Sequence, residues 1–294
     1  MSFGGRVPGP ALPEWIRGRK LRLGELHEIK ATMRRGGLHT VCEEARCPNR
    51  SECFSRGTAT FLINGRVCTR NCTYCSIAHG RPAPPDPAEP EQLVAAAREM
   101  GLRHVVITAV DRDDLPDGGA EGFVRAVRGL RALPDPPTVE VLTPDFRGEL
   151  GLVDRVVDAG PDVYNHNVET VPRLYREVRR SGRYHWALEV LERVAERAPH
   201  MVRKSGLMVG LGETPEEVLS VLADLASVGC QVVTIGQYLR PTPRQVPVAR
   251  YWTPDELADL ERHGPALGLE VIAGPFVRSS YRAEEAFLRV VAGS

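Results

Sequence analysis

The sequence predicts an α/β protein built as a partial (β/α)6 barrel, with an extension at each end of the chain. Two observations predict this fold. Short runs of apolar and β-branched residues recur from residue 60 onward, and longer amphipathic stretches separate them. Such alternation is typical of parallel sheets covered by helices. Six units are too few for a closed eight-stranded barrel, but they can form a curved sheet with the helices outside.

The individual elements follow from local signals. Two helix starts are well marked, because Thr214 and Thr253 each precede a proline and are followed three residues later by Glu217 and Glu256, which is the pattern of a capping box. The first forty residues are rich in Gly, Pro and Arg, with one candidate short helix at 24–33. Strands are expected at 60–63, 104–108, 138–142, 162–165, 202–209 and 231–235, with a further short run at 269–273. Helices are expected at about 90–100, 120–133, 148–158, 185–198, 215–228 and 254–267.

Composition and charge exclude several classes of partner. The 294 residues are 42% hydrophobic and 26% charged, and 38 basic residues balance 38 acidic ones. A neutral chain has no field that attracts it to nucleic acid or to an anionic membrane, so neither is expected as a partner. No stretch approaches the ~20 apolar residues of a membrane span, and the opening residues lack the apolar centre of a signal peptide. We therefore expect a cytoplasmic protein.

The cysteines are clustered: six of the seven fall between residues 42 and 75. A chain of this size in a reducing compartment does not need disulfides, so the clustering indicates metal binding. Cys68, Cys72 and Cys75 are spaced C-x3-C-x2-C directly after the first predicted strand. Three thiolates in a short loop can hold three irons of a [4Fe–4S] cluster and leave the fourth iron open. The alternative is a structural zinc site, although such a site takes four ligands and only His79 lies near.

The C-x3-C-x2-C motif, with Tyr74 before its last cysteine, resembles the signature of the radical S-adenosylmethionine (SAM) enzymes. The resemblance implies the same partial barrel, with the amino and carboxylate groups of SAM chelating the open iron. It also implies that the reduced cluster cleaves SAM to a 5′-deoxyadenosyl radical, while the protein supplies orientation and shielding. Solvated polar loops are the alternative explanation for polar residues at the predicted strand ends. Candidate SAM contacts at these ends, in addition to Tyr74, are Asp111, Asp113, Asn165, Asn167, Glu169, Lys204 and Arg240.

A second triplet, Cys42, Cys47 and Cys53, is spaced C-x4-C-x5-C. One cluster needs only one triplet, so the second triplet indicates a second [4Fe–4S] cluster with a separate task. Its spacing closely resembles the auxiliary-cluster motif of the lipoyl synthase family. The remaining cysteine, Cys230, begins an apolar strand and is expected to be a buried, inert thiol. The family resemblance extends over nearly the whole chain, including the runs at 111–119, 165–170, 204–210, 236–242 and 278–281.

The run at 278–281 reads Arg-Ser-Ser-Tyr and resembles the other mark of that family. The resemblance implies that one of its serines ligates the fourth iron of the auxiliary cluster through oxygen. We expect Ser280 in this role, with Ser279 second, and we count Arg278 with Ser280 among the catalytic residues. A hard oxygen ligand is a weaker partner for an iron–sulfur centre than a thiolate, so it can leave. The alternative is that the two serines cap a helix that begins near Arg282.

The family resemblance implies insertion of two sulfur atoms at C6 and C8 of an octanoyl chain held on a lysine of a carrier domain. The auxiliary cluster would supply the sulfur, in a sulfurtransferase reaction of lipoate biosynthesis. Implied partners are octanoylated lipoyl domains of 2-oxoacid dehydrogenase E2 subunits and of the glycine cleavage H protein, an electron donor such as ferredoxin or flavodoxin, and an iron–sulfur carrier protein. The expected division is 1–57 with the auxiliary cysteines, 58–268 as the barrel, and 269–294 with the Arg-Ser-Ser-Tyr run.

Two other functions fit less well. A methylthiotransferase would be expected to carry a separate N-terminal cluster domain and an RNA-binding domain, which a neutral chain of 294 residues does not indicate. A non-catalytic iron–sulfur or zinc protein would not need a coordinatively open triplet beside a six-unit barrel. Iron and sulfide analysis separates the two-cluster enzyme from a zinc protein, because two clusters predict roughly eight irons and eight sulfides per chain, whereas a zinc protein is colourless.

Overall fold

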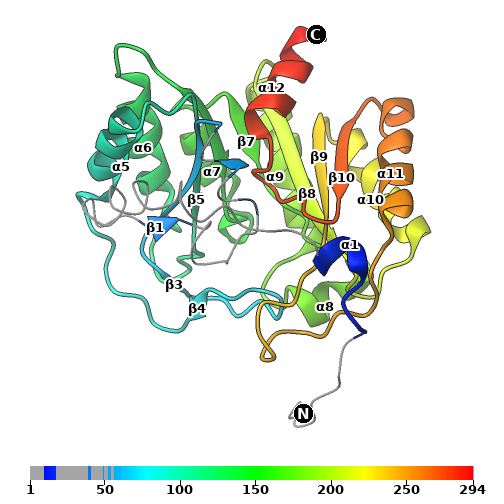
Figure 1. Cartoon of the computed structure of the whole chain (residues 1–294). Helices are drawn as coiled ribbons and strands as arrows, with labels where there is room; N and C mark the ends of the chain where they lie inside the picture. Colours follow the sequence, from blue (N-terminus) through cyan, green and yellow to red (C-terminus); the bar gives the residue numbers. More distant parts are fainter. Residues whose placement is uncertain (1–9, 18–38, 41–48, 50–51, 54–55, 294) are drawn as a thin grey trace.

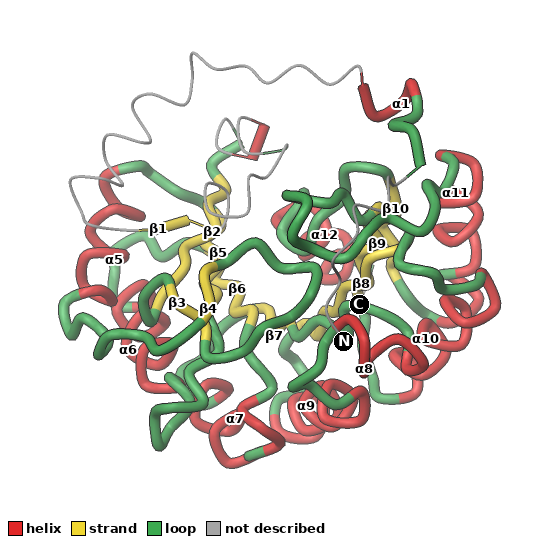
Figure 2. Tube along the Cα trace, turned by 90° about the horizontal axis from the view of Figure 1, so that it is seen from below, coloured by secondary structure: helices red, strands yellow, loops and turns green. Residues whose placement is uncertain are grey.

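The computed structural model describes residues 10–17, 39–40, 49, 52–53 and 56–293. Its centre is an eight-stranded sheet whose strands, in spatial order, are β1 (His39–Thr40), β2 (Thr58–Ile63), β5 (His104–Ala109), β6 (Thr138–Leu142), β7 (Val163–Asn165), β8 (Val202–Val209), β9 (Val232–Gln237) and β10 (Glu270–Gly274). Strands β2 to β10 run parallel, and the short β1 pairs antiparallel with β2 at one edge. Most of the helices lie outside the sheet in both ribbon views (Figure 1 and Figure 2).

The seven parallel strands of this sheet lie where the sequence predicts them, within a few residues at each end, and so do the six helices that follow the first six of these strands along the chain. The antiparallel β1 was not predicted. The helices are α5 (Glu89–Glu99), α6 (Ala120–Arg131), α7 (Leu150–Val157), α9 (Tyr184–Arg197), α10 (Pro215–Ser227) and α11 (Pro254–His263). The candidate helix at 24–33 falls outside the described residues.

Several short elements complete the described structure. A two-stranded parallel pair, β3 (Val67–Cys68) and β4 (Ala78–His79), flanks the first cysteine motif. The other helical elements are α1 (Glu14–Arg17), η1 (Phe146–Gly148), η2 (Pro172–Leu174), α8 (Tyr175–Val178), η3 (Pro265–Leu267) and α12 (Ala283–Ala292).

The sheet is an open arc. Figure 2 shows the strands curving around a central space, with α5, α6, α7, α9, α10 and α11 on the outer side. In the part of the chain that the structure describes, β1 and β10 are the two edges of the sheet, so the barrel is partial, as predicted. Strand β10 follows the sixth helix and pairs in parallel with β9, which adds a seventh parallel strand to the six expected units.

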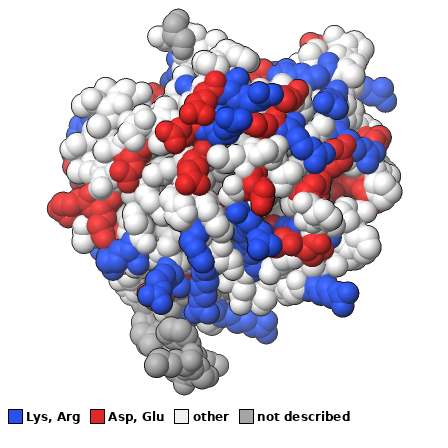
Figure 3. Space-filling model, turned by 180° about the vertical axis from the view of Figure 1, so that it is seen from behind, with Lys and Arg blue, Asp and Glu red and all other residues white. Residues whose placement is uncertain are grey.

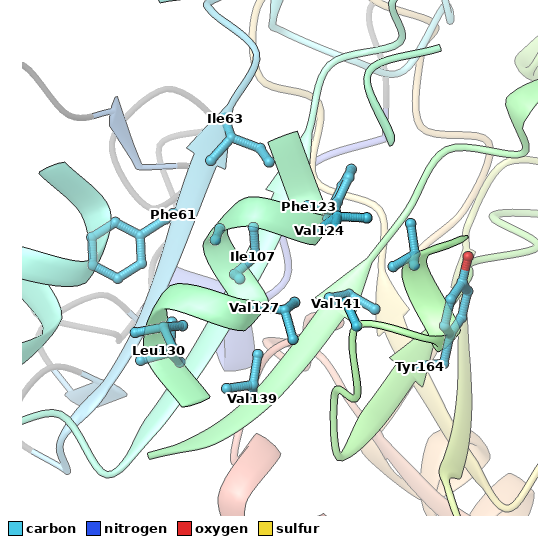
Figure 4. Close-up of a cluster of buried hydrophobic side chains, with 14 of the residues drawn as sticks. Phe61, Ile63, Ile107, Phe123, Val124, Val127, Leu130, Val139, Val141 and Tyr164 are labelled. Atoms are coloured by element: carbon cyan, nitrogen blue, oxygen red, sulfur yellow. The ribbon is translucent and has the colours of Figure 1, made fainter. Parts of the chain in front are cut away.

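Helices pack on the outer face of the sheet through regularly spaced apolar residues. On α6, Phe123, Val127 and Leu130 are fully buried and lie on one helix face. Figure 4 shows them against Ile107 and Val139 of the neighbouring strands. Burial of such side chains stabilises the fold by about 1.5–3 kcal/mol each.

Alternate residues of each strand point to the inner face of the sheet, where a cavity lies. On β2, Phe61 and Ile63 belong to the outer core, whereas Thr60 and Leu62 line a cavity on the inner side. On β5, Thr108 likewise faces the cavity. Because successive side chains of a strand point to opposite faces, the buried outer core fixes which residues face inward.

Charged residues of both signs are interspersed on the face opposite the view of Figure 1, and neither sign dominates it (Figure 3). Within the described ranges, no helix is long and apolar enough to cross a membrane. The expected burial of Cys230 is confirmed: the residue is 4% exposed, and burial raises the pKa of its thiol to about 12.

Candidate active site

A cavity of about 600 Å³ lies inside the arc, at the carboxyl ends of the parallel strands. The chain after each of β5, β6 and β7 contributes to its wall, as does the end of β9. Active sites of parallel (β/α) folds lie at this end because loops from several strands meet there. Sequence-predicted residues that line the cavity are Cys53, Cys68, Cys72, Tyr74, Cys75, Asp111, Asn167, Glu169, Arg240, Arg278, Ser279 and Ser280.

The first cysteine motif forms a loop that is hydrogen-bonded to the barrel at both ends. The backbone N–H of Thr69 donates to the carbonyl of Asp111 after β5 (3.0 Å). The backbone N–H of Thr73 donates to the carbonyl of Val178 at the end of α8 (3.0 Å). A turn within the loop joins the N–H of Cys75 to the carbonyl of Cys72 (3.1 Å). These bonds hold all three thiols of the motif at the cavity wall.

The three thiols fit an iron–sulfur cluster. Cys68, Cys72 and Cys75 are free cysteines on one cavity wall. Burial raises the pKa of the Cys68 and Cys72 thiols to about 12 and that of Cys75 to about 11, and a bound metal cation would reverse this effect. Among the described residues, no three His, Cys, Asp or Glu side chains converge on one ion. A cubane does not require this convergence, because each thiolate binds a different iron.

Arg70, inside the motif, anchors the loop and was not singled out from the sequence. Its side chain is buried and donates through Nε and Nη2 to Asp113 (2.8 and 2.9 Å), and through Nη1 and Nη2 to Asp145 (2.8 and 2.7 Å). Nη1 also lies 3.3 Å from Asp111. These paired contacts with two strand-end carboxylates fix the loop on β5 and β6. Asp113, a predicted SAM contact, is used in this pair and is not among the cavity-lining residues.

We expect Arg70→Met to lower the free energy of unfolding by about 3–5 kcal/mol, because buried Asp145 loses both hydrogen bonds from Arg70 and keeps only the longer contact with Arg179 (3.5 Å). The measurement is the urea midpoint of the anaerobically purified protein. Arg193→Met is the matched control, since Arg193 also bonds one carboxylate through two nitrogens, but its side chain is 36% exposed. That control should cost less than about 1 kcal/mol. Equal midpoints for the two variants would contradict the anchoring role.

Arg179 is a second buried cation that the sequence did not single out. It lines the cavity, donates through Nη1 to the carbonyl of Asn167 (2.8 Å), and lies 3.5 Å from Asp145 through Nη2. Its positive charge lowers the pKa of the Cys72 thiol, although burial raises that pKa by more. Burial, together with the charge of Arg179, also lowers the pKa of His166 to about 4, so His166 is neutral near pH 7. Arg179 therefore places a positive charge beside the cluster loop.

Some of the predicted SAM contacts line the cavity, and others do not. Glu169 lies in the wall with φ +67°, where its carboxylate accepts bonds from Asn167 Nδ2 (3.2 Å) and from Tyr74. Arg240 also lines the cavity, and it donates to the backbone carbonyls of residues 243 and 245. Asn165 and Lys204 are not among the lining residues; both are buried beneath the cavity.

The second cysteine motif is described in part. Cys42 and Cys47 lie outside the described residues, whereas Cys53 lines the cavity. Asn49, between the last two cysteines of this motif, donates to the carbonyl of Phe276 (2.6 Å). Nearby, Tyr281 Oη donates to the carboxylate of residue 52 (3.1 Å). The structure therefore brings the motif against the Arg-Ser-Ser-Tyr run, more than 220 residues further along the chain.

The two serines of that run have different environments. Ser279 Oγ accepts from Asn165 Nδ2 (3.0 Å) and donates to Asn167 Oδ1 (2.9 Å). Both serines line the cavity, and no hydrogen bond to the Ser280 hydroxyl is found among the described residues. Gly236 lets the run approach β9, because a β-carbon there would overlap the carbonyl oxygen of residue 277. Of the two serines, Ser280 therefore has the hydroxyl that is not bonded to Asn165 and Asn167.

The helix-capping alternative for these serines is wrong. Helix α12 begins at Ala283, and its N-cap is Arg282, with φ +51° and no capping bond from a side chain. The serines precede the cap and point to other partners or to the cavity. Arg278 lines the same cavity and donates through Nη1 to its neighbour's carbonyl (2.6 Å).

The fold and the cysteine loop define a class that comparison with known proteins supports. The family model described as "Radical SAM superfamily" matches residues 62–225. The solved structure of methylornithine synthase matches with a TM-score of 0.55 and 13% identity, covering 87% of this chain and 83% of that one. Coproporphyrinogen III oxidase from Escherichia coli, described as a radical SAM enzyme, matches with a TM-score of 0.52 and 14% identity, covering 74% and 55%. The chain is a radical SAM protein.

Closer relatives narrow the class. A protein named lipoyl synthase from Xylella fastidiosa (strain M23) is 52% identical over 283 residues, which cover 95% of this chain and 76% of the relative. Another lipoyl synthase, from Xanthomonas euvesicatoria pv. vesicatoria (strain 85-10), is 52% identical over 285 residues, covering 95% and 84%. The chain belongs to the lipoyl synthase family. Membership confirms the predicted cofactors, SAM and two [4Fe–4S] clusters.

Proposed function

We propose that this enzyme inserts two sulfur atoms at C6 and C8 of an octanoyl chain that is bound through an amide to a lysine of a carrier domain. The observation that carries the proposal is one cavity that both cysteine motifs and the C-terminal run share. Cys68, Cys72 and Cys75 line it together with Cys53 and Ser280. Two centres on one cavity allow the carbon that loses hydrogen to meet the sulfur that replaces it.

The two triplets take separate roles in this proposal. The first triplet holds the radical cluster, and Cys42, Cys47, Cys53 and Ser280 hold the auxiliary cluster, which is consumed as the sulfur substrate. When bound, SAM and the radical cluster supply the hydrogen-abstracting radical, one SAM for each C–H bond that becomes a C–S bond. Apolar residues of the wall are suited to hold the octanoyl chain and to exclude water. They include Leu62, Val110, Leu142, Leu207 and Met208.

The polar side chains of the wall suit the charged end of SAM. The carboxylates of Asp111 and Glu169 are positioned to receive a cationic amino group, and Arg179 is positioned to receive a carboxylate. Tyr74 and Asn167 hold Glu169 in place through hydrogen bonds. We keep Arg240 as a candidate contact, since it lies on the same wall.

Ser280→Cys tests the auxiliary site. A thiolate in place of a hard oxygen should hold the fourth iron more tightly, so the cluster resists dismantling. We expect both clusters and the formation of 5′-deoxyadenosine to persist, while the doubly sulfurated product falls at least about tenfold. Mass analysis of an octanoylated carrier peptide measures the product. Ser227→Cys, at an exposed serine of α10, is the control and should leave the product unchanged. Wild-type yield from Ser280→Cys would contradict the ligand assignment.

The partners remain those that the family implies. We propose octanoylated lipoyl domains of 2-oxoacid dehydrogenase E2 subunits and the glycine cleavage H protein as carriers, a ferredoxin or flavodoxin as electron donor, and an iron–sulfur carrier protein that rebuilds the auxiliary cluster. A neutral net charge and no expected membrane contact support a cytoplasmic location. We also propose the division into 1–57, 58–268 and 269–294, within which β10 of the last segment joins the sheet.

A further inference from the structure

An ionic cluster is buried beneath the cavity, on the inner side of the sheet. Lys204 Nζ of β8 lies 3.1 Å from each carboxylate oxygen of Glu140 on β6. Asn165, on the strand between them, is paired with Lys204 across the sheet. His104 Nε2 of β5 lies 3.5 Å from Glu140. All four side chains are at most 2% exposed, and none of them lines the cavity.

A gain in stability does not by itself explain why Glu140 and Lys204 are buried as an ion pair. Two opposite charges lose their hydration when they are buried, and well-packed apolar residues in their place are often as stable or more stable. Lys204 and then His104 counteract the effect of burial and bring the pKa of Glu140 down to about 2, so Glu140 is charged near pH 7. A charged carboxylate inside the barrel is a strong, fixed hydrogen-bond acceptor.

A chain of hydrogen bonds leads from this acceptor to the serine run. Asn165 Nδ2 donates to Glu140 Oε1 (2.8 Å), and the same nitrogen donates to Ser279 Oγ (3.0 Å). Because an ionised carboxylate can only accept, Glu140 fixes which end of the Asn165 amide faces Ser279. Ser279 Oγ must then accept from Asn165, which leaves its hydrogen to donate to Asn167 Oδ1 (2.9 Å). Gly206 provides the room, since a β-carbon there would lie 2.9 Å from Asn167 Oδ1.

We propose that the Glu140–Lys204 pair positions Ser280: through Asn165 it holds the hydroxyl of Ser279, and this fixes the turn that presents the Ser280 oxygen to the auxiliary cluster. The inference rests on the proposed function, in which Ser280 is a cluster ligand. Glu140, Lys204 and Asn165 are positioning residues, since they act through Ser279 and are not part of the cavity wall. Lys204 therefore takes a role other than the SAM contact that the sequence predicts.

The test compares three changes along the chain of bonds in the holoenzyme. They are the pair replacement Glu140→Leu/Lys204→Met, Asn165→Leu, and Ser279→Ala. The readout is the rate at which a chelator removes iron from the auxiliary cluster under anaerobic conditions. The change in the EPR spectrum on adding SAM to the reduced protein reports that the radical cluster stays intact. Each change should speed iron release roughly tenfold, since each frees the turn that carries Ser280.

A double-mutant cycle separates positioning from general destabilisation. If the pair acts through Ser279, adding Ser279→Ala to the pair replacement should give no further increase in the rate of iron release. The urea midpoint supplies the structural readout. The pair replacement should keep it close to wild type, whereas Glu140→Leu alone should lower it, because Lys204 is left buried without a partner.

Ser280→Ala distinguishes the failure of this inference from that of the proposed function. Rapid iron release from Ser280→Ala, with wild-type rates from the pair replacement and Asn165→Leu, would overturn the positioning inference and leave the proposed function standing. Wild-type release from Ser280→Ala itself would overturn the ligand role and, with it, the positioning role. Additive rates in the double-mutant cycle would also overturn the inference, because the pair would then act independently of Ser279.

Discussion

Cys72→Ala should reduce the formation of 5′-deoxyadenosine from SAM to the background rate. The three thiolates of the first motif act as a unit, and loss of one leaves the radical cluster without the ligands that keep a single iron open. The same result is expected for Cys68→Ala and Cys75→Ala. Chromatographic measurement of 5′-deoxyadenosine, with excess dithionite as reductant, checks the prediction.

Cys230→Ala is the matched control for this prediction. Cys230 is also a free cysteine, but it is buried in the core and lies outside the cavity wall. Its removal should cost some stability and leave SAM cleavage at the wild-type rate per cluster. Normal cleavage by any variant of the first triplet would overturn the assignment of the radical cluster.

Cys53→Ala should separate the two reactions. With the auxiliary cluster lost and the first motif intact, SAM cleavage should remain measurable, while transfer of sulfur to the octanoyl carrier should cease. Cys42→Ala and Cys47→Ala should behave alike. Parallel assays of 5′-deoxyadenosine and of the carrier mass measure the two reactions in one incubation. A doubly sulfurated carrier from Cys53→Ala would show that the sulfur comes from another source.

The fold was predictable because its signals are local. Both predicted capping boxes are present, with Thr214 accepting from the N–H of Glu217 and Thr253 from that of Glu256. Strand positions followed from short β-branched runs, whose alternate residues divide between core and cavity. Strand β10 was recognised as a run but not counted as a seventh unit, since its pairing with β9 depends on the chain returning to the sheet edge.

The cluster thiols were predictable for the same reason, because their spacing within one loop determines what they can bind. Arg70 and Arg179 were not, since basic residues are spread along the whole chain and only the fold shows which are buried beside carboxylates. The hydrogen bond between Asn49 and Phe276 was not predictable either, because 227 positions separate the two residues and only the tertiary structure brings them together.

Lys204 was expected at the carboxyl end of its strand, but the structure places it near the start. It is the third residue of β8 (Val202–Val209), so it lies toward the base of the barrel, whereas Gly206 and Met208 of the same strand reach the cavity. Seven of the eight residues of this strand are buried, and the run itself gives no signal for which residue lies at the carboxyl end. Asp113 was expected to contact SAM, but its carboxylate accepts hydrogen bonds from Arg70 and does not line the cavity.

The central claim is that one cavity joins a SAM-cleaving cluster to a sulfur-donating one. The most direct test reconstitutes the holoenzyme with sulfide of a heavy sulfur isotope, incubates it anaerobically with octanoylated carrier peptide, SAM and reductant, and measures the peptide mass after one turnover. The account predicts a product in which both new sulfur atoms carry the heavy isotope. A product with unlabelled sulfur, or a peptide that gains no sulfur while SAM is cleaved, would contradict it.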